Sequence, residues 1–114
     1  MISYVIDEIK KADIEKVRAY LKGKNYKSPI EDIFWIQIPE ELLNATQKEH
    51  FASCGPYIFS LELGRDFIKL ELLVRATNKI RCSCISFATV QQRNYGINLV
   101  ENIYFSVINE KKLN

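Results

Sequence analysis

The chain has 114 residues, of which 47% are hydrophobic and 26% are charged, and its net charge at neutral pH is +2. This composition is typical of folded soluble proteins and argues against intrinsic disorder. A chain of this length can bury a core without metal or disulfide staples, so we expect one domain over residues 1–114.

The sequence also bears on where the protein resides. No apolar run reaches the roughly 18 residues that a membrane-spanning helix needs. The N-terminal stretch MISYVIDEIKK carries acidic residues within its apolar part and lacks a basic leader, unlike a secretory signal peptide. Three cysteines are an odd number, which argues against a secreted disulfide framework. We therefore expect a cytoplasmic protein that does not act at a membrane.

Charge is distributed unevenly along the chain. Basic residues exceed acidic ones before residue 28 and after residue 74, and acidic residues exceed basic ones between these positions. Such alternation is typical of faces that complement each other within one fold or across a dimer. Domains that bind nucleic acid cluster their basic residues more strongly. A nucleic-acid partner is therefore not expected.

The first predicted elements are two helices. Apolar residues in segment 2–10 recur at spacings of three and four, as on one face of a helix. A strand is the alternative for this segment, but it would place Asp7 on an apolar face with Val5. A second helix is predicted over residues 14–21, with Asp13 as its N-cap.

A strand and a further helix are predicted next. Residues 32–39 form a short run rich in β-branched and aromatic side chains, which is typical of a strand. Pro39 ends this run and suits the first position of a helix. That helix is predicted over residues 40–54, where the sequence CGP terminates it. His50 and Cys54 would lie on its inward face.

The clearest pattern in the chain is a β-hairpin. Hydrophobic residues alternate over 57–63 and again over 67–74, and the three residues GRD between them have the length of a hairpin loop. Residues 80–88 then supply a third strand. Together these segments predict an antiparallel meander.

The alternation in the predicted third strand indicates which of its side chains face the core. Continued alternation places Cys82 and Cys84 beneath the helices. Ile85 and Phe87 then lie on the outer side of the sheet. Two apolar residues on an outer face suggest a covered patch, such as a subunit interface.

A helical region completes the chain. Thr89 and Gln92 have the spacing of a capping box, which predicts a helix start. Gly96 is expected to interrupt this helix, with a new start at Asn98. The fold class is therefore predicted as α+β: an antiparallel three-stranded meander plus one further strand, with one face packed by three to four helices, in the order helix, strand, helix, three strands, helix.

All the cysteine and histidine residues of the chain fall on faces predicted to point inward. His50 and Cys54 are four residues apart on a helix, and Cys82 and Cys84 are two apart on a strand. Three thiolates and one imidazole are a recognised tetrahedral ligand set for zinc. These four residues are therefore candidate metal ligands or reactive thiols.

A simpler interpretation is that these residues fill the core. Cysteine is among the most buried residue types and packs as a small hydrophobe. A strand would hold the Cβ atoms of Cys82 and Cys84 roughly 6–7 Å apart, whereas the cysteines of zinc knuckles are spaced so that a turn brings them together. Core packing without a cofactor is therefore the default expectation, and zinc binding is the alternative.

The sequence also suggests a surface for partners. The polar run of residues 89–95 could recognise a ligand, and Gln92 and Arg93 within it join Ile85 and Phe87 as candidate interaction residues. No set of residues matches a catalytic arrangement, so the sequence favours a non-catalytic protein-interaction module that acts as a homodimer. The alternative is a zinc- or thiol-dependent module built on the four cysteine and histidine residues.

Overall fold

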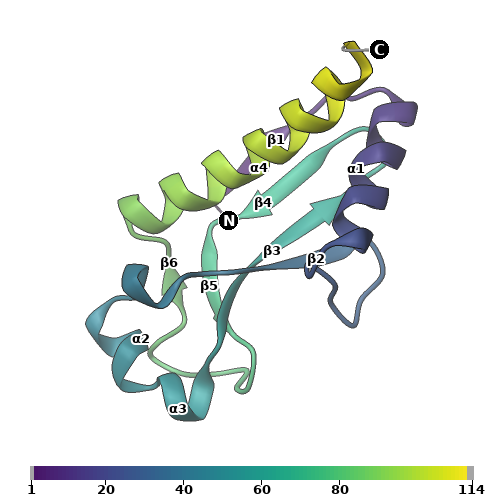
Figure 1. The fold of residues 1–114 in the computed structure, drawn as a ribbon. Coiled ribbons are helices and arrows are strands. Elements are labelled where there is room, and N and C mark those ends of the chain that lie inside the picture. Colours follow the sequence, from purple (N-terminus) through teal and green to yellow (C-terminus); the bar gives the residue numbers. More distant parts are fainter. Residues whose placement is uncertain (1, 113–114) are drawn as a thin grey trace.

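The computed structural model describes residues 2–112 of the chain, with side chains as far as residue 108. This described part is an α+β fold, as predicted, in which helices pack on a six-stranded antiparallel sheet (Figure 1). In chain order its elements are β1 (Ser3–Ile6), α1 (Lys11–Gly23), β2 (Ile33–Gln37), the 3-10 helix η1 (Glu40–Leu42), α2 (Ala45–Glu49), α3 (Phe51–Cys54), β3 (Tyr57–Leu63), β4 (Ile68–Glu71), β5 (Leu73–Ala76), β6 (Ser86–Phe87) and α4 (Val90–Lys112).

Strand β3 is the centre of the sheet. It pairs with β2 along one edge, and with β4 and then β5 along the other. β1 continues the sheet beyond β4, and β6 continues it beyond β5. The predicted hairpin is confirmed, with Leu63 opposite Ile68, but its second strand divides at Leu72 into β4 and β5. The long strand β3 therefore joins the part of the sheet that contains β1 and β4 to the part that contains β5 and β6.

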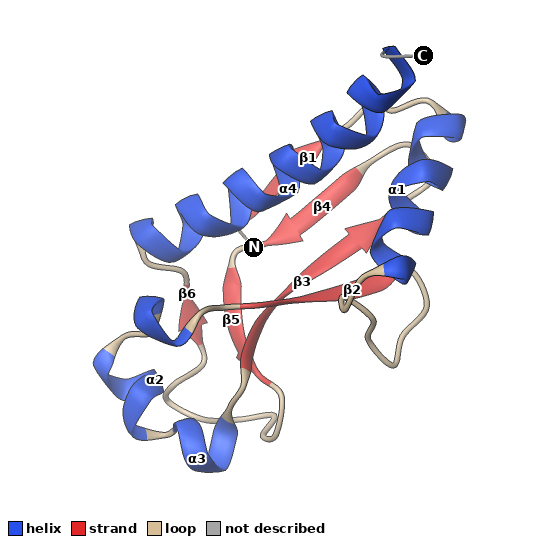
Figure 2. Cartoon of the chain, in the orientation of Figure 1, coloured by secondary structure: helices blue, strands red, loops and turns tan. Residues whose placement is uncertain are grey.

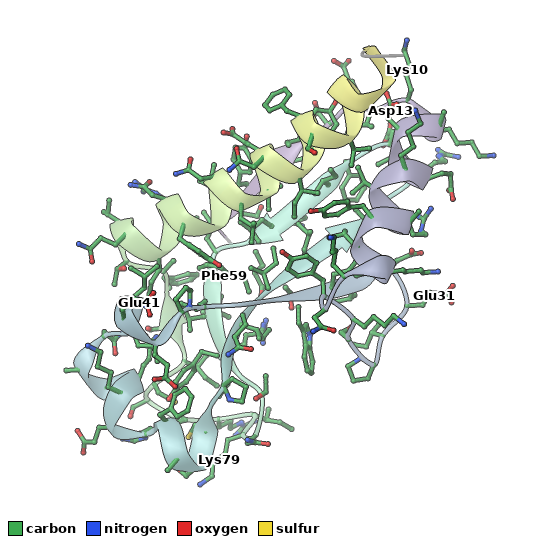
Figure 3. All side chains as sticks on the ribbon, viewed as in Figure 1. Lys10, Asp13, Glu31, Glu41, Phe59 and Lys79 are labelled. Carbon is green, nitrogen blue, oxygen red and sulfur yellow. The ribbon has the colours of Figure 1, made fainter. Side chains whose placement is uncertain are left out.

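Two helices, α1 and α4, lie side by side over one face of this sheet and share its core (Figure 2). Their buried apolar side chains are Ile14, Val17, Leu21, Val100, Ile103 and Val107. Spacings of three and four residues place each set on one side of its helix. Figure 3 shows the layer that these side chains share with the sheet, in which Phe59 is fully buried. Among the described residues, no helix combines the length and the apolarity that crossing a membrane requires.

Helix α4 comes close to the sheet at Gly96. A Cβ atom at this position would lie 3.1 Å from the side chains of Phe59 and Leu70, which is closer than ordinary packing allows. The predicted break at Gly96 and the new helix start at Asn98 are wrong, because α4 is continuous through both positions. The glycine permits a close approach of helix and sheet and does not form a turn.

The N-terminal segment is a strand and not the predicted helix. β1 pairs with β4 along its whole length, with Ile6 opposite Ile68. A strand does not place Asp7 on an apolar face, because β1 ends at Ile6 and the chain then turns at Glu8, whose φ is +55°. The backbone hydrogen bonds of an edge strand outweigh the local helical spacing here.

The single helix predicted over residues 40–54 is divided into three pieces, η1, α2 and α3. Leu43 and Asn44 have extended backbone conformations and separate η1 from α2. The Asn44 side chain accepts a hydrogen bond from the Gln47 N–H at 2.8 Å, and the Gln47 side chain accepts one from the Asn44 N–H at 3.0 Å. Asparagine favours a cap over a helix interior, so α2 begins anew at this point.

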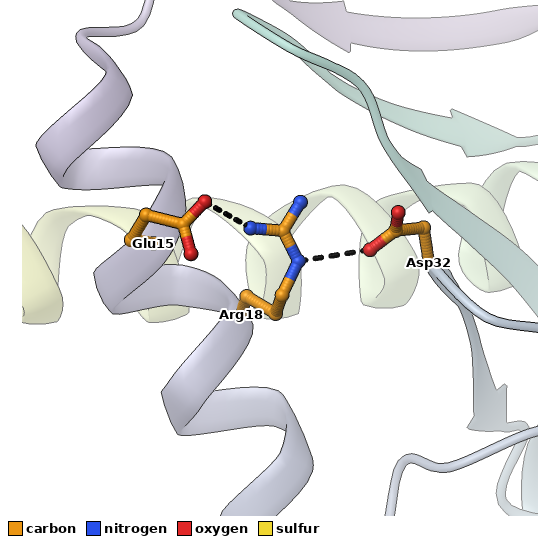
Figure 4. A network of polar contacts seen from close by, with 3 residues as sticks. All are labelled: Glu15, Arg18 and Asp32. Atoms are coloured by element: carbon orange, nitrogen blue, oxygen red, sulfur yellow. Dashed lines mark hydrogen bonds and ion pairs between the residues drawn. The ribbon is translucent and has the colours of Figure 1, made fainter.

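Polar contacts also tie helix α1 to the segment that leads into β2. Arg18 on α1 donates a hydrogen bond to the Asp32 carboxylate, just before β2, at 2.8 Å, and it also pairs with Glu15 on its own helix (Figure 4). Asp13 is not the cap of α1, which begins at Lys11 without a side-chain cap. These contacts lie at the partly exposed edge of the core, where they help to align α1 with the sheet.

The third strand predicted over residues 80–88 is reduced to the two residues of β6. Residues 77–85 form a loop instead, in which the Ile80 side chain is 94% exposed. Phe87 points outward as predicted and is 55% exposed. Ile85 does not, because it is half-buried and packs against the core. The loop, and not a strand, carries two of the three cysteines.

Candidate metal centre

The single histidine and the three cysteines of the chain come together at the end of the fold where α2 and α3 lie (Figure 1). The Nδ1 atom of His50 lies 3.1 Å from the sulfur of Cys82. The sulfur of Cys54 lies 3.5 Å from the sulfur of Cys82. One ring nitrogen and three sulfurs, including that of Cys84, all lie within 4.8 Å of one another. The structure thus brings together all four predicted metal candidates.

Two segments far apart in the sequence supply these side chains. His50 lies at the junction of α2 and α3, and Cys54 is the last residue of α3. Cys82 and Cys84 lie in a turn, which is closed by a hydrogen bond of 3.0 Å from the Ile85 N–H to the Cys82 carbonyl. A strand would separate these two cysteines, whereas the turn directs both sulfurs to one centre. The geometric objection to a metal site was therefore wrong.

Hydrogen bonds hold the loop of residues 77–85 against the end of α3. The N–H of Asn78 donates to the carbonyl of Cys54 at 3.1 Å. Thr77 donates to the carbonyl of Pro56 twice, through its N–H at 3.2 Å and through its hydroxyl at 2.8 Å. The loop is thus anchored beside one candidate ligand before it reaches the turn that carries two others.

A buried pair of glutamines supports the other end of the loop. Gln47 on α2 donates a hydrogen bond of 3.2 Å to the carbonyl of Cys84. Gln92 on α4 donates to the Gln47 side-chain oxygen and to the Leu42 carbonyl, each at 2.9 Å. Gln92 also forms the predicted capping box with Thr89. Both glutamines are fully buried with protein partners, so the pair can orient the backbone that carries Cys84.

The environment gives the two thiols of the loop different acidities. Hydrogen bonding with the Cys84 thiol, and then with the Cys84 backbone N–H at 3.4 Å, lowers the pKa of Cys82 to about 6. Burial, followed by the hydrogen bond with Cys82, raises the pKa of Cys84 to about 11. The thiolate is the form of cysteine that binds metals and attacks electrophiles. The environment therefore favours the thiolate form more at Cys82 than at Cys84.

The dimensions of the cluster match a tetrahedral zinc site. Zinc–sulfur bonds of about 2.3 Å and zinc–nitrogen bonds of about 2.0 Å place the ligand atoms roughly 3.5–3.8 Å apart. The separations of 3.1 Å and 3.5 Å, and the upper limit of 4.8 Å, require only small side-chain movements to reach this geometry. Three thiolates and one imidazole fill all four positions. Closed sets of this kind are typical of structural and not of catalytic zinc.

Core packing, which is the default expectation from the sequence, accounts for only part of this cluster. Cys54 and Cys84 are buried, as that interpretation requires. Cys82 and His50 are half-buried and contact each other through polar atoms, which packing alone does not explain. Gln47, which supports the Cys84 backbone, was not predicted as part of the site. The capping-box spacing at the start of α2 is the pattern that could have indicated it.

The four predicted interaction residues do not form one surface. Gln92 is 0% exposed and makes internal contacts, so its predicted role in binding a partner is wrong. Arg93 and Phe87 are exposed on α4 and β6, and Ile85 is half-buried. The sequence reveals that Gln92 is polar, but it does not reveal the facing polar groups that allow its burial.

Comparison of the chain with protein-family models, with curated proteins and with solved structures found no match.

Proposed function

We propose that this protein is a small zinc-dependent module in which one structural zinc ion is bound by His50, Cys54, Cys82 and Cys84. The observation that supports this function is the convergence of four ligand atoms, within 4.8 Å of one another, from two separate segments. The residue types are those of a common structural zinc site. Hydrogen bonds to the backbone on both sides of the cluster favour a preformed arrangement.

The zinc ion would join the α2–α3 segment to the loop of residues 77–85. This loop lacks regular secondary structure, and Ile80 near its middle is almost fully exposed. Loops with few buried contacts open at low free-energy cost. Ligands from both segments would close the loop on α3, so the free energy of zinc binding would contribute to the folding of this end of the molecule.

A thiol-dependent activity is the other use to which these residues could be put. Cys82 is half-buried, its pKa is lowered to about 6, and it contacts His50, which are properties of a reactive cysteine. A nucleophile of this kind does not require Cys54 and Cys84. Metal binding is the better proposal because it uses all four residues.

The metal content of the purified protein tests the proposed function. Protein prepared without chelators should contain one zinc ion per chain by elemental mass spectrometry. Cobalt(II) substituted for zinc should give the intense visible absorption of a tetrahedral thiolate site. Cys82→Ala and Cys84→Ala should each weaken zinc binding strongly, because each removes one of four ligands.

A matched control lies between the two cysteines of the turn. Ser83 is exposed and contributes no ligand, so Ser83→Ala should retain one zinc ion per chain. Metal-free protein that takes up no zinc on titration would overturn the proposal. The same conclusion would follow if Cys82→Ala bound zinc as tightly as Ser83→Ala.

We further propose that the protein self-associates through β6. Among the described residues this strand pairs with β5 alone, so one of its edges is open, and the large apolar side chain of Phe87 is 55% exposed on it. Open strand edges with exposed apolar side chains favour pairing with another chain. Sedimentation at micromolar concentration should show a dimer that Phe87→Ser weakens and Val90→Ser, at another exposed apolar position, does not. A wild-type monomer under these conditions would contradict the proposal.

A further inference from the structure

We propose that Cys54 and Cys82 form a peroxide-sensitive thiol pair, and that their oxidation to a disulfide removes two of the four zinc ligands and releases the ion. The release of zinc rests on the proposed function. The formation of the disulfide does not, because it requires only the two thiols. The site is therefore a candidate for reversible oxidative modification as well as for metal binding.

The geometry of the two sulfurs supports this pairing. The Cys54 and Cys82 sulfurs lie 3.5 Å apart and contact each other directly. Cys54 is fixed at the end of α3, whereas Cys82 belongs to a loop whose preceding residues are exposed. A small movement of the loop therefore suffices to bring the sulfurs to bonding distance. The pair joins segments 28 residues apart in the sequence, so the backbone imposes no short, strained ring.

Access to solvent distinguishes the three cysteines. Cys54 is 1% exposed and Cys84 is 0% exposed, whereas Cys82 is half-buried. A small oxidant therefore reaches Cys82 first. Cys84 is a poorer partner for Cys82, because two cysteines separated by one residue in a tight turn can close only a small ring. Cys54 is thus the thiol best placed to complete the reaction.

The reaction with hydrogen peroxide proceeds in two steps. The Cys82 sulfur attacks one peroxide oxygen, the O–O bond breaks and an S–O bond forms, and the thiol proton leaves with the second oxygen as water. The Cys54 sulfur then attacks the sulfenic sulfur of Cys82, displacing the hydroxyl group, which takes the Cys54 proton and leaves as a second water. Two thiols lose two electrons, and one peroxide is reduced to two waters.

The consequence for the metal follows from the ligand count. The disulfide leaves only His50 and Cys84 to hold the ion, and two ligands do not form a stable zinc site. The new covalent bond still links the loop to α3, in the place where the zinc ion would link them. We therefore expect the oxidised protein to remain folded while it loses its metal.

Peptide mapping of peroxide-treated protein tests the pairing. Cleavage after lysine and arginine places Cys54 in the peptide of residues 49–65 and Cys82 with Cys84 in the peptide of residues 82–93. Reduced zinc-free protein and zinc-loaded protein are each treated with hydrogen peroxide and analysed by mass spectrometry without reduction. In both samples these two peptides should be joined. In the zinc-loaded sample a chromogenic chelator should detect one released zinc ion for each disulfide formed.

Single variants identify the cysteines that take part. Cys84→Ala should still yield the joined peptides, because Cys54 and Cys82 remain. Cys54→Ala should abolish the joined peptides and leave Cys82 oxidised to a sulfenic or sulfinic acid. Far-ultraviolet circular dichroism checks that each variant is folded. Where a variant is not, fragmentation of the joined wild-type peptides between Cys82 and Cys84 shows which of these two cysteines is linked to Cys54, and a link through Cys84 alone would refute the proposed pair.

The possible failures can be told apart. If the peptides are not joined in the zinc-free protein, or if wild type forms only a Cys82–Cys84 disulfide, the thiol pair is refuted whether or not zinc binds. If the disulfide forms in zinc-loaded protein while the zinc remains bound, the proposed release is refuted. If the protein takes up no zinc before peroxide is added, the proposed function fails, and the zinc-free sample still decides whether the thiol pair exists.

Discussion

Replacement of Gln92 by leucine tests whether the buried glutamine pair stabilises the fold. Leucine has a similar size and a similar helix propensity, so the change removes hydrogen bonds and alters little else. Gln92 donates to the Leu42 carbonyl and to the Gln47 side chain, each at 2.9 Å. It also accepts a hydrogen bond of 3.0 Å from the N–H of Thr89 at the start of α4.

The expected loss in the free energy of unfolding is about 2–4 kcal/mol. Gln47 is fully buried and Leu42 is half-buried, so water can replace few of the hydrogen bonds that Gln92 donates to them. The Leu42 carbonyl loses the Gln92 donor, and the Gln47 side-chain oxygen keeps only its hydrogen bond from the Asn44 N–H. A buried polar group that loses a partner costs about 1–3 kcal/mol. Thr89 is exposed, so its N–H can donate a hydrogen bond to water in place of Gln92. Loss of the cap therefore adds only about 1 kcal/mol. Burial of the apolar leucine side chain offsets part of this loss in the free energy of unfolding.

Urea denaturation measures this loss, and the fluorescence of Trp35, the single tryptophan, reports on unfolding. The control is Gln91→Leu, at the preceding and exposed position, which should change stability by no more than about 0.5 kcal/mol. A loss below about 1 kcal/mol for Gln92→Leu would refute the role assigned to the buried pair. Equal losses for the two variants would do the same.

Three further substitutions test contacts in the rest of the fold. The hydrogen bond of Tyr4 to Glu101, together with burial, raises the pKa of Tyr4 from 10.0 to about 12, so its stabilisation is complete below pH 10 and is lost as the pH rises toward 12. The stability difference between wild type and Tyr4→Phe in urea should therefore shrink over this range, and a constant difference would contradict the reasoning. Gly96→Val should lower the free energy of unfolding by about 1–3 kcal/mol through overpacking against the sheet, and Asn94→Val, on the exposed side of α4, by less; equal losses would show that Gly96 does not limit the packing. Arg18→Ala should cost about 1 kcal/mol or less because its ion pairs are partly exposed, and the loss should diminish in high salt; a larger, salt-independent loss would show that the pairs are not screened by solvent.

The elements that were predicted correctly are those whose patterns are local. The alternation on either side of GRD predicts the hairpin of β3 and β4, because period-two alternation distinguishes the two faces of a strand. Thr89 with Gln92 predicts where α4 begins, because the capping box that these residues form is made by near neighbours in the sequence. In each case neighbouring residues contain the information that the structure uses.

The elements that were predicted wrongly depend on partners that the local sequence does not show. Segment 2–10 has helical spacing, but β4 offers an open edge with which β1 pairs. Gly96 was interpreted as a helix break, but it provides space for the side chains of Phe59 and Leu70. Gln92 was interpreted as a surface residue, but Gln47 makes its burial possible. Each error has the same physical cause, which is a tertiary contact that outweighs a local preference.

The sequence by itself determined the α+β class, the central hairpin and the chemical identity of the candidate site, since His50 and the three cysteines are all the strong zinc ligands of these types that the chain contains. Only the tertiary structure decided that these residues meet. The strand assumed for residues 80–88 would separate Cys82 from Cys84, whereas the turn at residues 82–85 and the hydrogen bonds between the loop and α3 bring their sulfurs together. The convergence of distant side chains depends on how two segments pack, and packing is a property of the folded chain as a whole.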